Sequence, residues 1–281
     1  MSRRVALVSD STSVDPELAA KLGVTVVALR VVIAGRSYDE GAAATPEDVA
    51  VALKERWPVS TSRPPQQAFT DVYEQAARDG AAAVVSVHLS AAVSGTYESA
   101  ELAARRASIP VHTVDSRQLG MGTGFAVQAA AAVLTEGGSA GDAAAVAQRR
   151  SEATTALFYV DTLEYLRRGG RVGAAAALLG SALAVKPLLK VDRGRIVPLE
   201  KVRTAARAMQ RLEDLTMIAA GDHQVDVAVS HLANAQRAES LAERLRERIP
   251  EMAELVVNQV GAVIGAHVGP GMLAVVISPR S

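Results

Sequence analysis

The chain has 281 residues, which is enough for two domains of ordinary size. Its 30 basic and 30 acidic residues cancel, so no overall field draws the chain toward nucleic acid. Because it contains no cysteine, it can form neither disulfides nor thiolate metal sites. Hydrophobic residues make up 49% of the chain and aromatic residues only 3%, so we expect a sizeable core built mainly from alanine, valine and leucine.

The sequence predicts neither a secretory leader nor a membrane span. The basic residues at the start precede only four apolar residues, 5–8, whereas a secretory signal needs roughly 7–15. The longest uncharged stretches, 118–135 and 172–185, are interrupted by polar residues or glycine and fall short of the ~20 strongly apolar residues of a span. We therefore expect a cytoplasmic protein without a transmembrane segment, and transient contact with a membrane stays open.

The first half of the chain alternates short apolar runs with helical patterns. Asp15-Pro16 and Thr45-Pro46 are typical helix starts, and Gly23 and Pro58 end these two helices. Alternating strands and helices predict right-handed crossovers and a mostly parallel sheet. The expected strands are 5–8, 24–29, 59–61, 83–88 and 111–114, with a hairpin over 31–38 and further helices over 65–78, 95–107, 121–134 and 142–150.

Polar residues follow several of these predicted strands. They are Asp10, Thr61, the segment Ser90–Ser94 and Asp115. Ligands of parallel sheets bind beyond the carboxyl ends of the strands. We therefore expect these residues to be neighbours.

The second half predicts an α/β domain with more antiparallel pairing. Asp192-Arg193-Gly194-Arg195 is a good hairpin turn between strands 185–191 and 196–199. The other expected strands are 156–160, 225–231, 255–260, 262–268 and 273–277, and the expected helices are 162–168, 174–183, 205–219 and 235–248. The predicted class is α/β, with a mostly parallel N-terminal domain over 1–153 and a mixed C-terminal domain over 154–281.

Two hydroxyl side chains, Thr61 and Ser94, precede predicted helices. Helix starts favour anions, and a hydroxyl there can donate to a carboxylate or phosphate oxygen. The plainer alternative is that each hydroxyl only caps its helix. Ser94 is not in a Gly-x-Ser-x-Gly nucleophile elbow, because positions 92 and 96 are Ala and Thr, and this argues against a hydrolase.

The basic candidates are His267, Arg171 and Arg203. His267 lies between a predicted strand and a glycine turn, where it is either a satisfied structural residue or a pH-responsive donor to an anion. Arg171 and Arg203 belong to two basic runs, which are either solvated surface or contacts to a phosphate. The other four histidines show no metal-like spacing and no Walker or dinucleotide motif is present, so neither a metal site nor ATP binding is predicted.

Four phrases, in their order and spacing, closely resemble the DegV family of bacterial fatty-acid-binding proteins. They are Asp10-Ser11-Thr12-Ser13, Thr61-Ser62-Arg63-Pro64, the run from Ser94 to Ala100 and the run from Asp161 to Arg171. Further matches include Asp115-Ser116-Arg117, the run from Leu178 to Ser181, Lys186-Pro187 and the run from Lys201 to Thr204. The resemblance covers essentially the whole chain, with small departures at Arg63 and Pro65.

The resemblance implies two α/β domains with a long-chain fatty acid in the cleft between them. Members of the family resemble FakB, the non-catalytic, fatty-acid-binding subunit of bacterial fatty acid kinase. By this resemblance Thr61, Ser94 and His267 bind the carboxylate, and Arg171 and Arg203 contact phosphate or the partner. The chain itself has no cofactor; a separate kinase uses ATP and Mg²⁺ to phosphorylate the carboxylate, and the acyl phosphate enters phospholipid synthesis.

Two other functions stay open at this point. One is a paralogue that binds or transports lipid without a kinase. The other is a catalyst, either a serine hydrolase or a small-molecule kinase, although the missing elbow and phosphate-loop motifs argue against both. The sequence determines neither the length or unsaturation of the acyl chain nor the oligomeric state.

Overall fold

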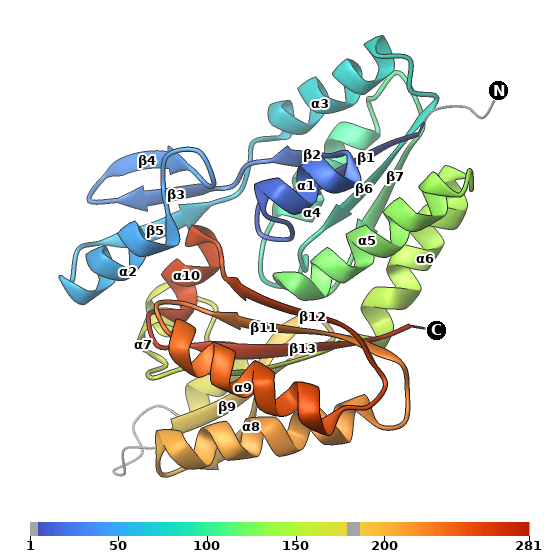
Figure 1. Ribbon diagram of the computed structural model, residues 1–281. Coiled ribbons are helices and arrows are strands. Elements are labelled where there is room, and N and C mark those ends of the chain that lie inside the picture. The colour runs from blue at the N-terminus through green and yellow to red at the C-terminus, as the bar shows by residue number, and fades with distance from the viewer. Residues whose placement is uncertain (1–4, 179–185, 281) are drawn as a thin grey trace.

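The computed structural model describes residues 5–178 and 186–280. In these residues the chain forms three sheets with helices packed around them (Figure 1). The first half contains a parallel sheet and the second half a mixed sheet, so the predicted α/β class is confirmed. The predicted boundary between residues 153 and 154 falls between the last helix of the first half and the first strand of the mixed sheet, and it stays a prediction.

The parallel sheet has four strands in the order β2-β1-β6-β7. Their bounds are Val5–Asp10 (β1), Val24–Val27 (β2), Ala83–His88 (β6) and Val111–Asp115 (β7). Side chains alternate between the two faces of each strand, so both faces are apolar. Leu7 and Val85 face α1 (Pro16–Leu22), α5 (Met121–Thr135) and α6 (Ala140–Ala153), whereas Val8 and Val84 face α3 (Gln66–Arg78) and α4 (Thr96–Ala104).

The predicted helix starts of the first half are confirmed in atomic detail. Asp15 accepts a hydrogen bond from the Leu18 N–H at 2.8 Å and so caps α1. Thr45 caps α2 (Pro46–Lys54), and Asp48 completes a reciprocal capping box. Gly23 ends α1 in the left-handed conformation with φ 65°, which favours glycine.

One strand of the first half lies in a different sheet from the one predicted. The strand β5 (Val59–Ser62) pairs antiparallel with β3 (Arg30–Ile33), which forms a hairpin with β4 (Arg36–Asp39). The prediction that this strand belongs to the parallel sheet is therefore wrong. The hairpin leaves one edge of β3 unpaired, and β5 covers that edge while its sheet packs against α2 and the C-terminal helix α10.

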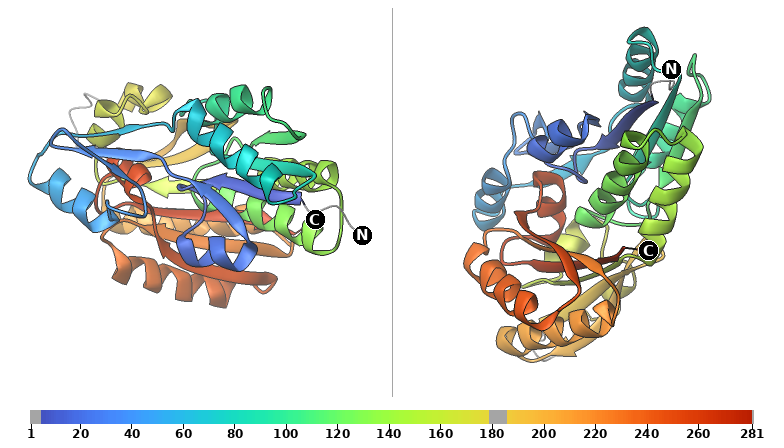
Figure 2. Two further views of the ribbon diagram at one scale, coloured as in Figure 1. Left: turned by 90° about the horizontal axis from the view of Figure 1, so that it is seen from above. Right: turned by 45° about the vertical axis from the view of Figure 1, so that its right-hand side comes forward.

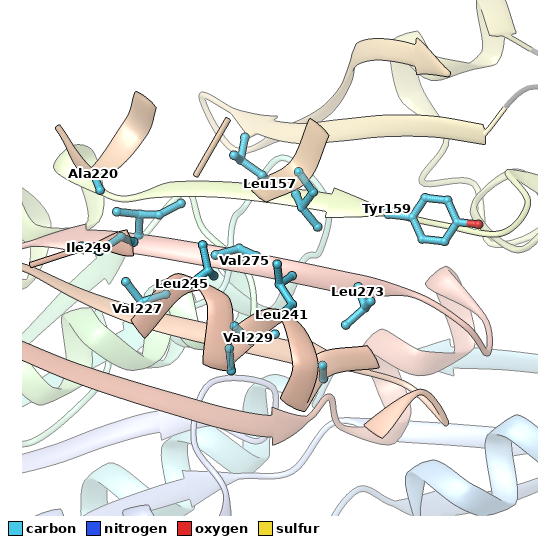
Figure 3. Close-up of a cluster of buried hydrophobic side chains, with 14 of the residues drawn as sticks. Leu157, Tyr159, Ala220, Val227, Val229, Leu241, Leu245, Ile249, Leu273 and Val275 are labelled. Atoms are coloured by element: carbon cyan, nitrogen blue, oxygen red, sulfur yellow. The ribbon is translucent and has the colours of Figure 1, made fainter. Parts of the chain in front are cut away.

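The mixed sheet has six strands in the order β10-β9-β8-β13-β11-β12. Their bounds are Thr155–Tyr159 (β8), Lys186–Asp192 (β9), Arg195–Val202 (β10), Val225–His231 (β11), Met252–Gln259 (β12) and Leu273–Pro279 (β13). One face packs against α8 (Ala205–Ala220) and α9 (Ala235–Arg248) through the cluster in Figure 3, which includes Leu157, Leu241 and Leu245. The opposite face, with Ala228 and Val276, packs against α5 of the first half.

Two elements of the second half differ from the predictions. Residues 262–268 form a helix, α10 (Ala262–Val268), and not a strand. An apolar run this short does not distinguish a buried helix from a strand by its periodicity. Here Gly265 lets the helix approach closely, because a Cβ there would lie 3.2 Å from Leu232. Of the predicted helix 174–183, the described part is a 3₁₀ helix, Gly173–Leu178, and the rest lies outside the described residues.

The helix α10 lies between the three-stranded sheet and the six-stranded sheet (Figures 1 and 2). It contacts α2, β3 and β5 on one side and the short helix α7 (Glu164–Arg168) on the other. The side chain of Glu40 connects the first turn of α10 to the first half of the chain. It accepts hydrogen bonds from the Val263 N–H at 2.7 Å and from Ser11 Oγ at 2.5 Å. Burial raises the pKa of Glu40, and the two hydrogen bonds oppose this rise.

We predict that Glu40→Ala lowers the free energy of unfolding by about 2–4 kcal/mol, because the substitution leaves two donors without their acceptor in a buried place. The matched control is Asp39→Ala, which removes an exposed ion pair with Arg30 and should cost less than about 1 kcal/mol. Urea unfolding followed by circular dichroism measures both. Equal losses in the two variants would contradict the role of Glu40 as a clamp on α10.

Candidate functional site

A cavity of about 200 Å³ lies where β5, the loop after β6 and α10 meet. One part of its wall is apolar and is contributed by Leu29, Leu89, Leu119, Leu166, Ile196 and Ile264. The polar part contains Ser62 and Arg63 besides Thr61, Ser94, Arg171 and His267. Four of the five predicted site residues therefore border one space. The apolar wall was not predicted, because each of its residues looks like an ordinary core residue in the sequence.

Thr61 and His267 are hydrogen-bonded although 206 residues separate them in the chain, with 2.8 Å between Thr61 Oγ1 and His267 Nε2. Thr61 lies within β5, paired with Val31 of β3, and α3 begins only at Gln66. The alternative that Thr61 caps a helix is therefore wrong. His267 lies in the last turn of α10, so the contact joins the small sheet to the second half of the chain.

The imidazole of His267 is neutral at pH 7. Burial, assisted by the nearby Arg171 guanidinium, lowers the pKa of His267 from 6.5 to about 4. Its Nδ1 atom is buried and has no hydrogen-bond partner among the described residues. A buried N–H without an acceptor is costly, so we assign the proton to Nε2, which donates to Thr61 Oγ1. The Thr61 hydroxyl then keeps its own proton to donate into the cavity.

Ser94 supplies a second hydroxyl to the wall of the cavity. It lies two residues before α4, and its Oγ accepts a weak hydrogen bond of 3.3 Å from the Thr96 N–H and lies 2.9 Å from Thr96 Oγ1. The N-cap residue of α4 is Gly95, which has no side chain to cap the helix. The Ser94 hydroxyl, one residue before the N-cap, accepts the Thr96 N–H instead. Its hydroxyl proton can point either to Thr96 or into the cavity.

Arg171 connects two loops at the polar end. Its Nε donates to the Val93 carbonyl at 3.1 Å, and its Nη1 donates to the Gly169 carbonyl at 2.6 Å. The guanidinium is thus held half-buried beside Ser94 and His267. It is one of two guanidinium groups in the wall of the cavity, and the other, that of Arg63, is paired with Glu98 at 2.7 Å.

Arg203 does not border this cavity. It follows β10 directly and is exposed, whereas the cavity contact of that strand is Ile196, near its other end. Seven residues of strand separate the two positions by about 20 Å. Arg203 therefore does not lie beside Thr61 and Ser94, and its contact with phosphate or a partner stays a prediction.

Asp10 and Asp115, which we expected to lie near the segment Ser90–Ser94, accept hydrogen bonds from backbone N–H groups in or next to that segment; Asp10 is buried and Asp115 is partly exposed. Asp10 accepts hydrogen bonds from the Leu89 N–H at 2.9 Å and from Thr12 Oγ1 at 2.6 Å. Asp115 accepts one from the Ala91 N–H at 3.1 Å. These contacts hold the segment that carries Ser94 on both sides.

One buried line of side chains has the order of a hydrolase triad. Asp10 Oδ2 lies 3.1 Å from His88 Nδ1, and His88 Nε2 lies 2.7 Å from Ser86 Oγ. Ser86 and His88 are fully buried in β6, and Ser86 Oγ is also 2.8 Å from the hydroxyl of Tyr73. No substrate reaches a serine in that position, so the line is a structural hydrogen-bond network.

Comparison with known protein families identifies the family to which this chain belongs. A profile described as "Uncharacterised protein, DegV family" matches residues 4–280. The chain belongs to the DegV family. A DegV domain-containing protein of Streptomyces coelicolor is 52% identical over 281 residues, which is 100% of both chains. A DegV domain-containing protein of Mycobacterium tuberculosis is 34% identical over 275 residues, 97% of this chain and 96% of the relative.

Solved DegV structures share the whole fold. A fatty-acid-binding DegV family protein from Thermus thermophilus superposes with a TM-score of 0.92 at 33% identity and covers 99% of this chain and 100% of its own. DegV of Bacillus subtilis, also described as a fatty acid binding protein, gives a TM-score of 0.91 at 32% identity over 99% and 100% of the two chains. DegV relatives thus bind fatty acids on the same scaffold.

Two further features of this DegV chain concern metals and membranes. In residues 5–178 and 186–280, no three His, Asp or Glu side chains are grouped so that they could hold a metal ion. Across the same residues, none of the helices is long and apolar enough to cross a bilayer.

The lowered pKa of His267 predicts a pH-dependent stability of the lipid-free protein. Between pH 6.5 and about 4 the unfolded chain binds a proton that the folded chain does not, so stability is complete above pH 6.5 and falls as the pH drops toward 4. The loss attributable to His267 is about 3 kcal/mol. Urea unfolding at several pH values should show this loss diminished in His267→Gln and unchanged in the control His112→Gln, an exposed histidine. The same slope in all three proteins would contradict the assignment.

Proposed function

We propose that this chain binds a long-chain fatty acid, with the carboxylate at the polar end of the cavity and the tail along its apolar wall. The observation that carries the proposal is that Thr61, His267 and Ser94 together border a mainly apolar cavity, with Thr61 and His267 hydrogen-bonded to each other. Hydroxyl donors suit a carboxylate, and leucine and isoleucine side chains suit an alkyl chain. The fatty acids bound by the Thermus and Bacillus relatives support this assignment.

The tail supplies most of the affinity. A C16 chain buries about 15 methylenes at about 0.8 kcal/mol each, a gross gain of about 12 kcal/mol before the ordering costs of binding. The neutral hydrogen-bond donors contribute less, and they fix the position of the head group.

A whole tail requires the apolar wall to move. The cavity of about 200 Å³ is smaller than the roughly 300–1,000 Å³ of most ligand pockets. A second cavity of about 560 Å³ begins on the other side of Ile264, whose side chain borders both spaces. Movement of this one side chain would extend the space available to the ligand.

We predict that the purified protein carries about one long-chain fatty acid per chain. Denaturing extraction followed by mass spectrometry identifies it. A protein that emerges free of lipid and also fails to take up palmitate or oleate would refute the proposed function.

Thr61→Val and Ser94→Ala should each weaken palmitate binding by roughly 10-fold to 100-fold, because each removes a hydrogen bond to a charged group worth about 1.5–3 kcal/mol. The matched control is Ser60→Ala, which removes an exposed hydroxyl from the adjacent position of β5. Titration of the lipid-free proteins measures the dissociation constants. Unchanged affinity in both site variants would show that the two hydroxyls do not contact the carboxylate.

We further propose that the bound carboxylate is presented to a separate fatty acid kinase, which forms an acyl phosphate for phospholipid synthesis with its own ATP and Mg²⁺. The support is the position of Arg171, a cation beside the carboxylate-binding hydroxyls, where a phosphoryl group would add negative charge. Arg203, exposed and about 20 Å from the cavity, suits contact with that partner better than contact with the ligand.

Arg171→Ala and Arg203→Ala should keep their bound fatty acid and lose at least tenfold in acyl phosphate formation, because each removes a cation proposed to act only in transfer or docking. The assay combines the loaded protein with a fatty acid kinase, ATP and Mg²⁺, and Lys201→Ala is the control for an exposed charge near Arg203. Turnover equal to that of the parent in both variants contradicts their role. A parent that binds lipid but supports no turnover with any kinase of its own cell is instead a lipid-binding paralogue without a kinase.

A further inference from the structure

The helices α7 and α10 meet through two contacts between an aromatic ring and a glycine. Gly169, directly after α7, lies against the imidazole of His267 on α10. In return Gly269, directly after α10, lies against the ring of Tyr165 on α7. The contacts are reciprocal, so they fix how the two helices lie relative to each other.

No side chain fits at Gly169 while His267 stays in place. A methyl group there would overlap His267 Nδ1 and come within 2.7 Å of Cε1. The backbone of Gly169 has φ −75° and ψ −5°, a conformation open to any residue. Glycine is therefore required at this position by the imidazole and not by the backbone.

At Gly170 the backbone conformation, and not packing, favours glycine. Gly170 has φ 72°, which favours glycine, but a Cβ there would meet nothing within 4 Å. In Arg168-Gly169-Gly170-Arg171, the first glycine is therefore required by packing against His267 and the second is favoured by its backbone conformation. This makes Gly170 a natural control for Gly169.

Gly169 also contacts the guanidinium of Arg171. Its carbonyl accepts the 2.6 Å hydrogen bond from Arg171 Nη1, so Arg171 and His267 are placed by the same residue. Pushing the imidazole away from α7 would move Nε2 from its place 2.8 Å from Thr61 Oγ1. Thr61 Oγ1 would then no longer accept a hydrogen bond from His267 Nε2, and its own proton would no longer be directed into the cavity.

We propose that Gly169 is a positioning residue for the fatty-acid carboxylate, because its missing side chain lets His267 lie against α7 with Nε2 on Thr61. The proposal rests on the proposed fatty-acid binding for its ligand. Its geometric part, that Gly169 sets the place of the imidazole, holds for the lipid-free protein as well.

A double-mutant cycle tests this coupling. Gly169→Ala should weaken palmitate binding by roughly 10-fold to 100-fold in the parent and by less than about twofold in a His267→Ala background, where the methyl group has nothing to displace. Gly170→Ala should lower stability through its strained backbone and leave palmitate affinity within about twofold of the parent. The same loss of affinity from Gly169→Ala in both backgrounds, or no loss in either, would overturn the proposal.

Nuclear magnetic resonance of the histidine ring separates this inference from the proposed function. In the lipid-free parent the His267 ring should stay neutral down to about pH 4. In Gly169→Ala the displaced ring should titrate closer to the ordinary value of about 6.5, and in Gly170→Ala it should behave as in the parent. An unchanged ring in Gly169→Ala refutes the positioning role alone, whereas a parent that binds neither palmitate nor oleate refutes the proposed function and the carboxylate role with it.

Discussion

The hydrogen bond between Thr61 and His267 is the contact on which the site depends. It connects a small antiparallel sheet in the first half of the chain to a short helix near its end. Neither residue reaches the other unless β5 pairs with β3 and α10 packs beneath that sheet (Figure 1). The polar end of the cavity is therefore a product of how the two halves are assembled.

The electrostatics of this junction suit holding an anion better than reacting with one. His267 is neutral because burial and Arg171 lower its pKa, so it orients a hydroxyl and does not act as a charged partner. Neutral donors would hold a carboxylate without a tight buried ion pair, which would carry a large desolvation cost. The line of side chains from Asp10 to Ser86, which has the order of a hydrolase triad, is buried inside the parallel sheet.

The scaffold around the site is held by polar groups, buried or partly buried, that do not line the cavity. Asp10 and Asp115 fix the loop that leads to Ser94, and Glu40 fixes the start of α10. Glycines act in the same way by leaving room: Gly265 for Leu232 and Gly169 for His267. A motif such as Arg168-Gly169-Gly170-Arg171 therefore combines a packing requirement, a backbone requirement and a charge in four adjacent residues.

The sequence alone determined the parts of this protein that depend on neighbouring residues. Caps such as Asp15 and Thr45, the turn at Gly23 and the alternation of the first half predicted the helices and the parallel sheet correctly, because these signals act over a few residues. Only the tertiary structure decided that β5 leaves the parallel sheet, that residues 262–268 form a helix and that Arg203 lies far from the cavity. Each of these depends on which distant surface a segment covers, and a short apolar run fits a strand or a helix equally well until that surface is present.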